Sequence, residues 1–298
     1  MDGSTPRPGL GRVVVGVDGS PSARTAVTWA AAEAAVRRSP LCLVHAVDAP
    51  TAFLPPGEGD GARRAGRELL DRTAETVIVH HPDLTVVTEL ADGAAPGCLR
   101  RSAARTGTVV VGHRGVGGFS ALLLGSVALE VAAAATTPVV VVRGGAEPTG
   151  AGTVLAAVRN ETDLGCARAA AREALLRKVP LKLLHVWGTP LSLGSRTAGH
   201  GDDEEAARQH VRVLATVSER MREEFPSLSL HTEGRRDPSV PGALVDASDR
   251  AGLLVVGGRR APGYLGRTLG RTTLSLLQHA HCPVDLIPRH GPGHGSTS

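Results

Sequence analysis

The sequence predicts an α/β protein made of two tandem units, each a five-stranded parallel sheet with helices on both faces. Three observations predict this fold class. The 298 residues suffice for two domains, since domains have about 150 residues each. Short continuous runs of Val and Leu alternate with Ala-rich stretches, a pattern typical of buried parallel strands joined by helices. The second half of the chain repeats the order of the first.

An internal repeat defines the two units. The segment LCLVHAV at Leu41–Val47 matches LKLLHVW at Leu181–Trp187, an offset of 140 residues. Further along, Gly112 matches Gly257, and the offset has become 145 residues. Loop insertions between two related domains would leave such a drift, so we interpret the repeat as a duplication.

The domain boundary is expected where the composition changes. Residues 144–152 read GGAEPTGAG, and this Gly, Pro and small polar content suits an exposed linker. We therefore expect one domain at residues 1–147 and a second at residues 148–298.

Each element of the first unit follows from local composition. The β-branched run at 12–17 predicts a strand, and the Ala-rich stretch at 22–38 predicts a helix that Pro40 closes before a strand at 41–47. The rest of the unit continues this alternation. It comprises a helix at 62–80, a strand at 85–89, a helix at 96–105, a strand at 109–112, a helix from Ser126 and a strand at 139–142.

One stretch, residues 121–142, is apolar and long enough to cross a bilayer. It is interrupted by Gly125, Ser126, Glu130 and Pro138. A helix of about ten residues, a turn at Pro138 and a buried strand explain every interruption, whereas a membrane span explains none.

Composition excludes several classes of function. The 33 basic and 29 acidic residues nearly balance at +4, unlike the concentrated charge of a DNA-binding domain, and 2% aromatic residues are too few for a single-strand nucleic-acid binder. The four Cys are scattered without C-x-x-C pairing, which argues against a disulfide framework or a zinc site and fits a reducing cytoplasm. The N-terminus lacks the apolar core of a signal peptide, so we expect a cytoplasmic protein without a membrane or nucleic-acid partner.

Asp18 is the first candidate binding residue. It follows the first strand, and the turn Gly19, Ser20, Pro21 leads from it into a helix. In an open parallel sheet the ligand crevice lies outside the strand ends, where a carboxylate can accept from ribose hydroxyls or a base amine. The alternative is an Asp that only caps the following helix.

A glycine-rich loop is the second candidate. The segment GHRGVGGFSALLLGS at residues 112–126 joins the end of the fourth strand to a helix. Glycines let the backbone come close to a ligand, and the free amides of a helix start attract phosphate. The alternative is a flexible surface loop followed by a helix cap.

At Asp18 and the segment 112–126 the sequence resembles the universal stress protein family. The ATP-binding members of this family carry a G-x2-G-x9-G-[S/T] pattern after the fourth strand. Gly112, Gly115, Gly125 and Ser126 match this pattern, and Asp18 matches the family's acidic residue after the first strand. The resemblance covers nearly the whole chain as a tandem pair of actinobacterial type. It implies two Rossmann-like domains of the adenine nucleotide alpha hydrolase-like kind.

The resemblance also implies a ligand and its site: ATP, with or without Mg²⁺, bound in the first domain. Asp18 and the backbone of Ala46 would hold the adenosine. The ribose and phosphates would be surrounded by Gly112, Arg114, Gly115, Gly125, Ser126 and Val127, and Val111 would also belong to the binding site. His113 stands where many relatives have Ser, so the resemblance assigns it no role.

The second unit departs from the pattern. Gly257 and Gly270 remain, but Arg260 replaces Gly115 and Arg271 replaces Ser126. Arg159 replaces Asp18 if the first strands are aligned without a gap. A bulky side chain at a glycine position blocks backbone approach, although guanidinium groups could instead bind an anion directly. We interpret the second domain as degenerate for ATP, retained as a pseudo-symmetric packing partner.

Other signals carry less weight. The chain has no Walker motif, no G-x-G-x-x-G after the first strand and no G-x-S-x-G elbow, and we expect no catalytic residues and no metal site. His45 and His185 recur at equivalent strand ends in both units, which favours a structural hydrogen bond over catalysis.

Three functions remain open at this point. The first is a universal stress protein that binds ATP as a regulatory ligand in a stress response, and the second is slow ATP hydrolysis or phosphotransfer at the same crevice with Asp18 and Ser126 as loose candidates. The third is a ligand-free interaction scaffold in which the last strands, 139–142 and 284–287, pair. For partners we expect ATP, pairing of the two domains within the chain, and a homodimer.

Overall fold

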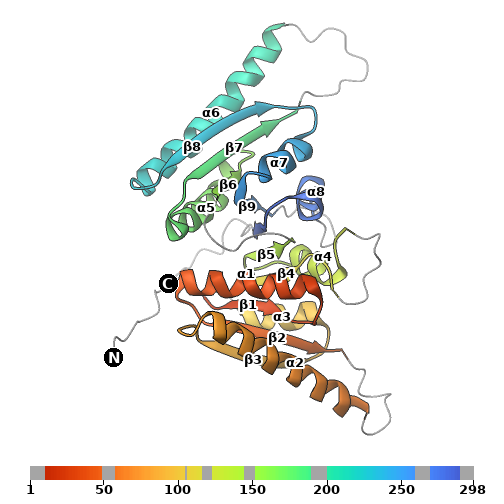
Figure 1. Ribbon diagram of the computed structural model, residues 1–298. Coiled ribbons are helices and arrows are strands. Elements are labelled where there is room, and N and C mark those ends of the chain that lie inside the picture. Colours follow the sequence, from red (N-terminus) through yellow and green to blue (C-terminus); the bar gives the residue numbers. More distant parts are fainter. Residues whose placement is uncertain are drawn as a thin grey trace, which may run out of the picture. The chain divides into compact units, whose positions relative to one another are not determined.

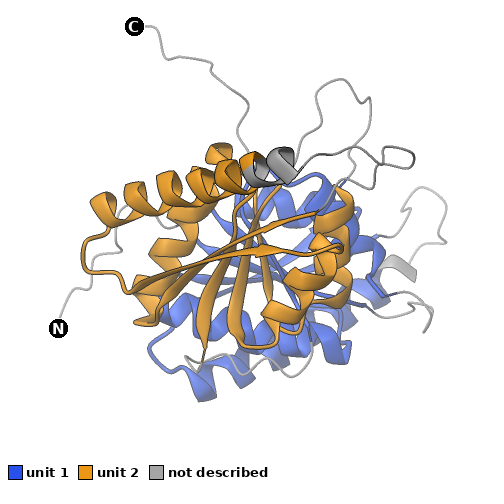
Figure 2. Ribbon diagram, turned by 90° about the horizontal axis from the view of Figure 1, so that it is seen from above, with its two compact units in different colours: residues 1–149, 259–269, 288–298 blue, residues 150–258, 270–287 orange. Residues whose placement is uncertain are grey.

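The computed structural model describes residues 11–48, 58–104, 106–115, 123–143, 152–188, 200–258 and 269–288. The chain divides into two compact units, the first comprising mainly residues 1–149 and the second residues 150–258 and 270–287 (Figure 2). Each unit holds parallel strands covered by helices, which confirms the predicted fold class. The expected linker lies almost entirely outside the described residues, so the boundary at 147/148 stays a prediction.

The first unit alternates strands and helices along the chain (Figure 1). Its sheet has the strand order β3-β2-β1-β4-β5 with every pair parallel. Helices α1 and α2 contact each other on one face, and α3 and α4 contact each other on the other face. The elements are β1 (Val13–Gly16), α1 (Pro21–Arg37), β2 (Leu41–Val47), α2 (Glu58–His80), β3 (Val86–Asp92), α3 (Ala95–Ala103), β4 (Thr108–Gly112), α4 (Ser126–Ala133) and β5 (Val139–Val142).

The second unit repeats this order. Its parallel sheet runs β8-β7-β6-β9-β10, with α5 and α6 on one face and α7 and α8 on the other. The elements are β6 (Thr153–Ala157), the 3₁₀ turn η1 (Glu161–Asp163), α5 (Leu164–Arg177), β7 (Leu181–Trp187), α6 (His200–Glu224), β8 (Leu230–Arg236), α7 (Val240–Ser248), β9 (Ala251–Gly257), α8 (Arg271–His279) and β10 (Val284–Ile287). The second copy is therefore the same fold, as the repeat predicts.

Local chemistry sets the ends of α1. The Ser20 hydroxyl accepts a hydrogen bond from the Ala23 amide at 3.0 Å, and Pro21 occupies the first helical position, where its missing N–H costs nothing. The helix ends at Arg38, whose backbone is left-handed with φ 52°. In the second unit α5 ends in the same way at Lys178, with φ 56°. The common geometry shows that both helices are stopped by the same turn before the following strand.

The interior is built from small aliphatic side chains. The valines of β1 and β5 are fully buried, and α1 presents a row of buried alanines to the sheet. Alanine leaves little bulk between helix and sheet, so the backbones approach closely and few aromatic rings are needed. Burial also raises the pKa of the Cys282 thiol to about 12, in keeping with a packed rather than a reactive cysteine.

Most predicted elements lie within a few residues of the observed ones. β3 is longer than predicted because Leu90, Ala91 and Asp92 continue to pair with β2 beyond the apolar run. The apolar stretch at 121–142 contains α4, the turn at Pro138 and β5, as expected. Within the part of the chain that the structure describes, none of the helices combines the length and the apolar character needed to cross a membrane.

A buried ion pair recurs on the first helix of each unit. Arg37 donates from Nε to Glu33 Oε1 at 2.5 Å and from Nη1 to Thr108 Oγ1 at 2.8 Å, which ties α1 to the start of β4. In the second unit Arg177 Nε lies 3.6 Å from Glu173 Oε2. Since all four side chains are nearly inaccessible, loss of one member takes the paired charge away from a buried ion.

We therefore expect Glu33→Ala to lower the free energy of unfolding of the first unit by about 3–5 kcal/mol. Urea unfolding measures this loss in a Trp187→Phe background, where the remaining fluorescence comes from Trp29, buried one helical turn before Glu33. The matched control is Glu68→Ala, which removes the carboxylate of an exposed pair with Arg72 on α2 of the same unit and should leave the midpoint nearly unchanged. Equal effects of the two substitutions would contradict the prediction.

Candidate functional site

A cavity of about 410 Å³ lies at the carboxyl ends of β1, β2 and β4 in the first unit. The lining comes from these strand ends, from α3, from the segment after β4 and from the start of α4. All nine residues that the sequence suggests for a ligand line this one cavity. They are Asp18, Ala46, Val111, Gly112, Arg114, Gly115, Gly125, Ser126 and Val127.

Asp18 is held in the turn between β1 and α1. Its Oδ1 accepts from the Ser20 amide at 2.9 Å, and Gly19 turns the chain with φ +82°. The cap of α1 is Ser20, because its hydroxyl accepts from a first-turn amide of the helix. The alternative interpretation of Asp18 as that helix cap is therefore wrong, and its carboxylate lies at the cavity instead.

Gly112, the last residue of β4, and Gly115, three residues later, let this part of the chain come close to the start of α1 and to Asp18. A Cβ on Gly115 would lie 2.6 Å from Asp18 Oδ2, and a Cβ on Gly112 would lie 2.7 Å from the carbonyl of Ser22. The first contact would displace the carboxylate, and the second meets backbone that cannot swing away. Glycine is thus required at position 112, whereas a side chain at position 115 would displace the Asp18 carboxylate from its place at the cavity.

Ser22 links α1 to the end of β4. Its Oγ accepts from the Arg114 amide at 3.2 Å and lies 3.0 Å from His113 Nδ1. Because the hydroxyl oxygen already accepts one hydrogen bond, its own hydrogen can go to Nδ1, which leaves the imidazole proton on Nε2. Burial, and then the positive charges of Arg143 and Arg114, lower the pKa of His113 below its ordinary value. His113 thus bridges α1 and the segment after β4 as a neutral ring, next to residues that line the cavity.

The start of α4 forms a polar end of the cavity. Gly125 is its cap residue and has no side chain to satisfy the first amides, while its own N–H donates to the His113 carbonyl at 2.8 Å. The first amides of a helix lack intrahelical acceptors and carry the positive end of the helix dipole. Arg114 lines the same cavity, and among the described residues its buried Nε has no hydrogen-bond partner. Both features favour an anion at this end.

The apolar part of the lining was not indicated by any motif. It includes Val44 on β2 and Ala95 and Leu99 on α3. His45 also lines the cavity, but its Nδ1 is 2.7 Å from the Val17 carbonyl, so one ring nitrogen donates to the backbone. His185 repeats this bond to the Val158 carbonyl at 2.7 Å, which confirms the predicted structural hydrogen bond in both units.

Comparison with known proteins agrees with the tandem arrangement. The model of the universal stress protein family matches residues 9–143 and again residues 151–288. The chain belongs to the universal stress protein family. A universal stress protein of Mycobacterium tuberculosis is 32% identical over 286 residues, which cover 91% of this chain and 94% of that protein. Another from Mycolicibacterium smegmatis is 29% identical over 290 residues, covering 92% and 96% of the two chains.

A solved structure shows the same fold over the whole chain. The crystal structure of a universal stress protein from Archaeoglobus fulgidus aligns with a TM-score of 0.69 at 15% identity, covering 94% of this chain and 98% of that one. At this identity the likeness concerns the fold alone. The chemistry of the site therefore has to be argued from the residues of this universal stress protein itself.

The second universal stress protein domain keeps the scaffold but not the side chains. Gly257 ends β9 and Gly270 caps α8, as Gly112 and Gly125 do in the first domain. Arg271 is the first residue of α8 and is exposed. Arg260 lies outside the described residues, as do Gly117, Gly118 and Phe119 of the first domain.

The pKa of His113 gives a testable pH dependence. A histidine whose folded-state pKa is depressed stabilises the protein fully above its unfolded pKa of about 6.5, and that contribution is lost as the pH falls through the folded pKa. We therefore expect the wild-type protein to lose more stability than His113→Asn between roughly pH 7.5 and 5.5. NMR titration of the imidazole checks the cause directly. A His113 resonance that titrates at or above the ordinary value would contradict the prediction.

Proposed function

We propose that this universal stress protein binds ATP in the cavity of its first domain, as a regulatory ligand in a stress response. The observation that carries the proposal is the convergence of Asp18, the glycines after β4 and the start of α4 on one cavity. These residues are far apart in the sequence, and a structural role alone does not require them to share a wall. The stress response, a cytoplasmic location and a homodimer stay predictions from the sequence.

The two ends of the cavity differ in chemistry as the two ends of a nucleotide do. The wall formed by Val44, Leu99 and Val111 is aliphatic and suits the faces of a base. Another part of the lining has Arg114 and the first amides of α4, which suit phosphates. Asp18 lies at the strand ends, where a carboxylate accepts from ribose hydroxyls. An adenine nucleotide would thus have its base in the apolar part and its phosphates at α4.

The nucleotide is proposed as a ligand rather than a substrate. Phosphoryl transfer needs a positioned water or acceptor and compensation of the charge on the phosphates. Among the described residues that line the cavity, Asp18 and Ser126 offer side-chain oxygens, and Asp18 already accepts from the Ser20 amide. The second domain is proposed to bind no ATP, since Arg159 and Arg271 replace these two residues.

The full chain should bind one equivalent of ATP, and Gly115→Arg should weaken binding by at least about 100-fold, two steps of 1.4 kcal/mol. The reason is steric, because even a Cβ at this position meets the Asp18 carboxylate. Isothermal titration calorimetry measures affinity and stoichiometry, and mass spectrometry of gently purified protein measures retained nucleotide. Gly61→Arg is the matched control, since a Cβ there has open space on α2. Unchanged affinity in Gly115→Arg would refute the proposed site.

Arg114→Ala should separate the phosphate end from the nucleoside end. A hydrogen bond to a charged group is worth about 1.5–3 kcal/mol, so ATP affinity should fall by roughly 10- to 100-fold. Adenosine, which has no phosphate, should bind the variant as it binds the wild-type protein. If both ligands lost affinity equally, Arg114 would act on the shape of the cavity and not on the phosphates. Release of inorganic phosphate by the wild-type chain at rates that Ser126→Ala abolishes would favour an enzyme instead.

A further inference from the structure

The second domain has a cation at the strand end where the first domain has a carboxylate. The two positions are equivalent in structure, because Val17 and Val158 both accept from the histidine of the neighbouring strand. The next residue is Asp18 in the first domain and Arg159 in the second. The structural anchor supports the gap-free alignment of these first strands.

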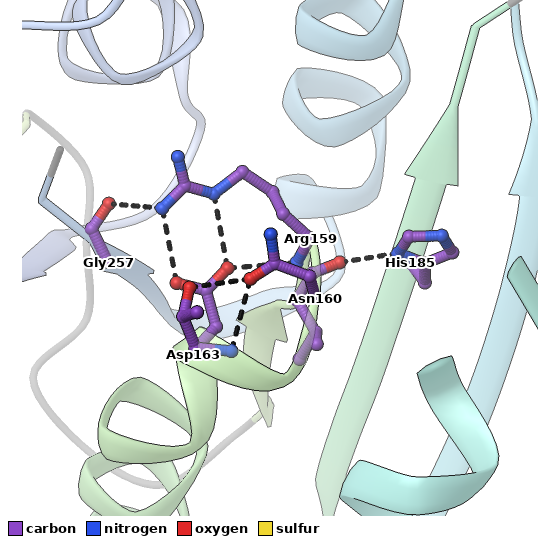
Figure 3. Close-up of polar contacts among 7 residues, drawn as sticks. Arg159, Asn160, Asp163, His185 and Gly257 are labelled. Atoms are coloured by element: carbon purple, nitrogen blue, oxygen red, sulfur yellow. Dashed lines mark hydrogen bonds and ion pairs between the residues drawn. The ribbon is translucent and has the colours of Figure 1, made fainter. Parts of the chain in front are cut away.

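Arg159 is fixed by Asp163 through three contacts (Figure 3). Its Nε lies 3.1 Å from Oδ2 and its Nη2 lies 3.1 Å from Oδ1, a two-pronged pairing of guanidinium and carboxylate. The backbone N–H of Arg159 also donates to Oδ2 at 2.9 Å. The Asp163 side chain has no exposed surface, whereas that of Arg159 is 42% exposed. A guanidinium group with two nitrogens paired to a buried carboxylate has little freedom to move into solvent.

The guanidinium also crosses to the neighbouring strand end. Arg159 Nη2 lies 3.5 Å from the carbonyl oxygen of Gly257, the last residue of β9 (Figure 3). In the first domain the corresponding strand ends, at Asp18 and Gly112, bound the cavity. The Arg159 side chain therefore bridges, in the second domain, the two strand ends that correspond to those bounding the cavity of the first domain.

We propose that Arg159 determines which domain accepts a nucleoside: its guanidinium, held by Asp163, occupies the crevice of the second domain and excludes the ligand. This inference rests on the proposed function of the first domain. Direct anion binding by Arg159 is disfavoured, because its guanidinium is already paired with the Asp163 carboxylate. The second domain thus carries its own occupant in place of a ligand.

A double substitution tests the exclusion. Asp163 stands four residues after Arg159, and Ser22 stands four residues after Asp18. Arg159→Asp with Asp163→Ser therefore introduces the pair of residues found in the first domain and leaves no carboxylate pair at 159 and 163. We expect the wild-type chain to bind one equivalent of adenosine and the double variant to bind two, measured by calorimetry. Adenosine is the probe because it does not depend on the altered phosphate end of the second domain.

The control has the same charge change at a remote place. Arg168→Asp with Glu224→Ser removes the exposed pair between α5 and α6 and should leave the stoichiometry at one. Circular dichroism and thermal unfolding establish that each variant is folded. A second variant, Arg159→Ala with Asp163→Asn, removes the guanidinium but keeps a side-chain oxygen at residue 163 to accept from the backbone N–H of residue 159. This variant should also bind a second equivalent of adenosine.

The outcomes separate the two proposals. A folded double variant that still binds one equivalent, as the wild-type chain does, would overturn the role of Arg159 and leave the first-domain site intact. Two equivalents in the wild-type chain would overturn it as well. If the wild-type chain bound neither ATP nor adenosine, the proposed function would fail. A double variant that then bound one equivalent would still support exclusion by Arg159, and a double variant that bound none would overturn both proposals.

Discussion

The close approach of β4 to the turn after β1 is the constraint on which the candidate site depends. The end of β4 lies so near to α1 that Gly112 has no room for a side chain, and three residues later Gly115 lies against the Asp18 carboxylate. Ser22 then fastens the two segments through the Arg114 amide and the His113 ring. The segment after β4 is thereby aimed at the start of α4, where Gly125 donates back to the His113 carbonyl. These contacts bring Arg114 and the start of α4 to the same cavity as the apolar residues Val44 and Leu99.

The alanine-rich helices make the approach possible. Buried alanines on α1 let this helix sit close to the sheet, so that its first turn reaches the end of β4. The buried pair of Glu33 and Arg37 holds the other end of the same helix to Thr108 at the start of β4. Both ends of β4 are therefore tied to α1. These contacts favour one register of β4 against β1, and this register sets the positions of Gly112 and Gly115.

The sequence predicted those parts of the molecule whose causes are local or repeated. Alternating composition located the strands and helices, and recurrence of His45 and His185 identified a bond that both domains share. The nine site residues were indicated by glycine spacing and by family resemblance, and they share one cavity. Leu99 and Ala95 were missed because a wall residue on α3 has no spacing signal of its own. Asp18 was left open between two roles because Asp and Ser are both good helix caps, and only the geometry distinguishes Ser20 as the cap.

The two domains differ in how the same strand ends are filled, and this difference has an energetic consequence. In the second domain the Arg159–Asp163 pair is part of the chain, so its contribution to stability is present whatever the ligand concentration. In the first domain a ligand that binds only the folded state adds RT ln(1 + [L]/Kd), about 2.7 kcal/mol at one hundred times Kd. A change in nucleotide concentration would then alter the stability of one domain and leave the other unaffected. With the proposed ligand in the first domain and the proposed role of Arg159 in the second, two domains of the same fold would differ in that only the first responds to nucleotide.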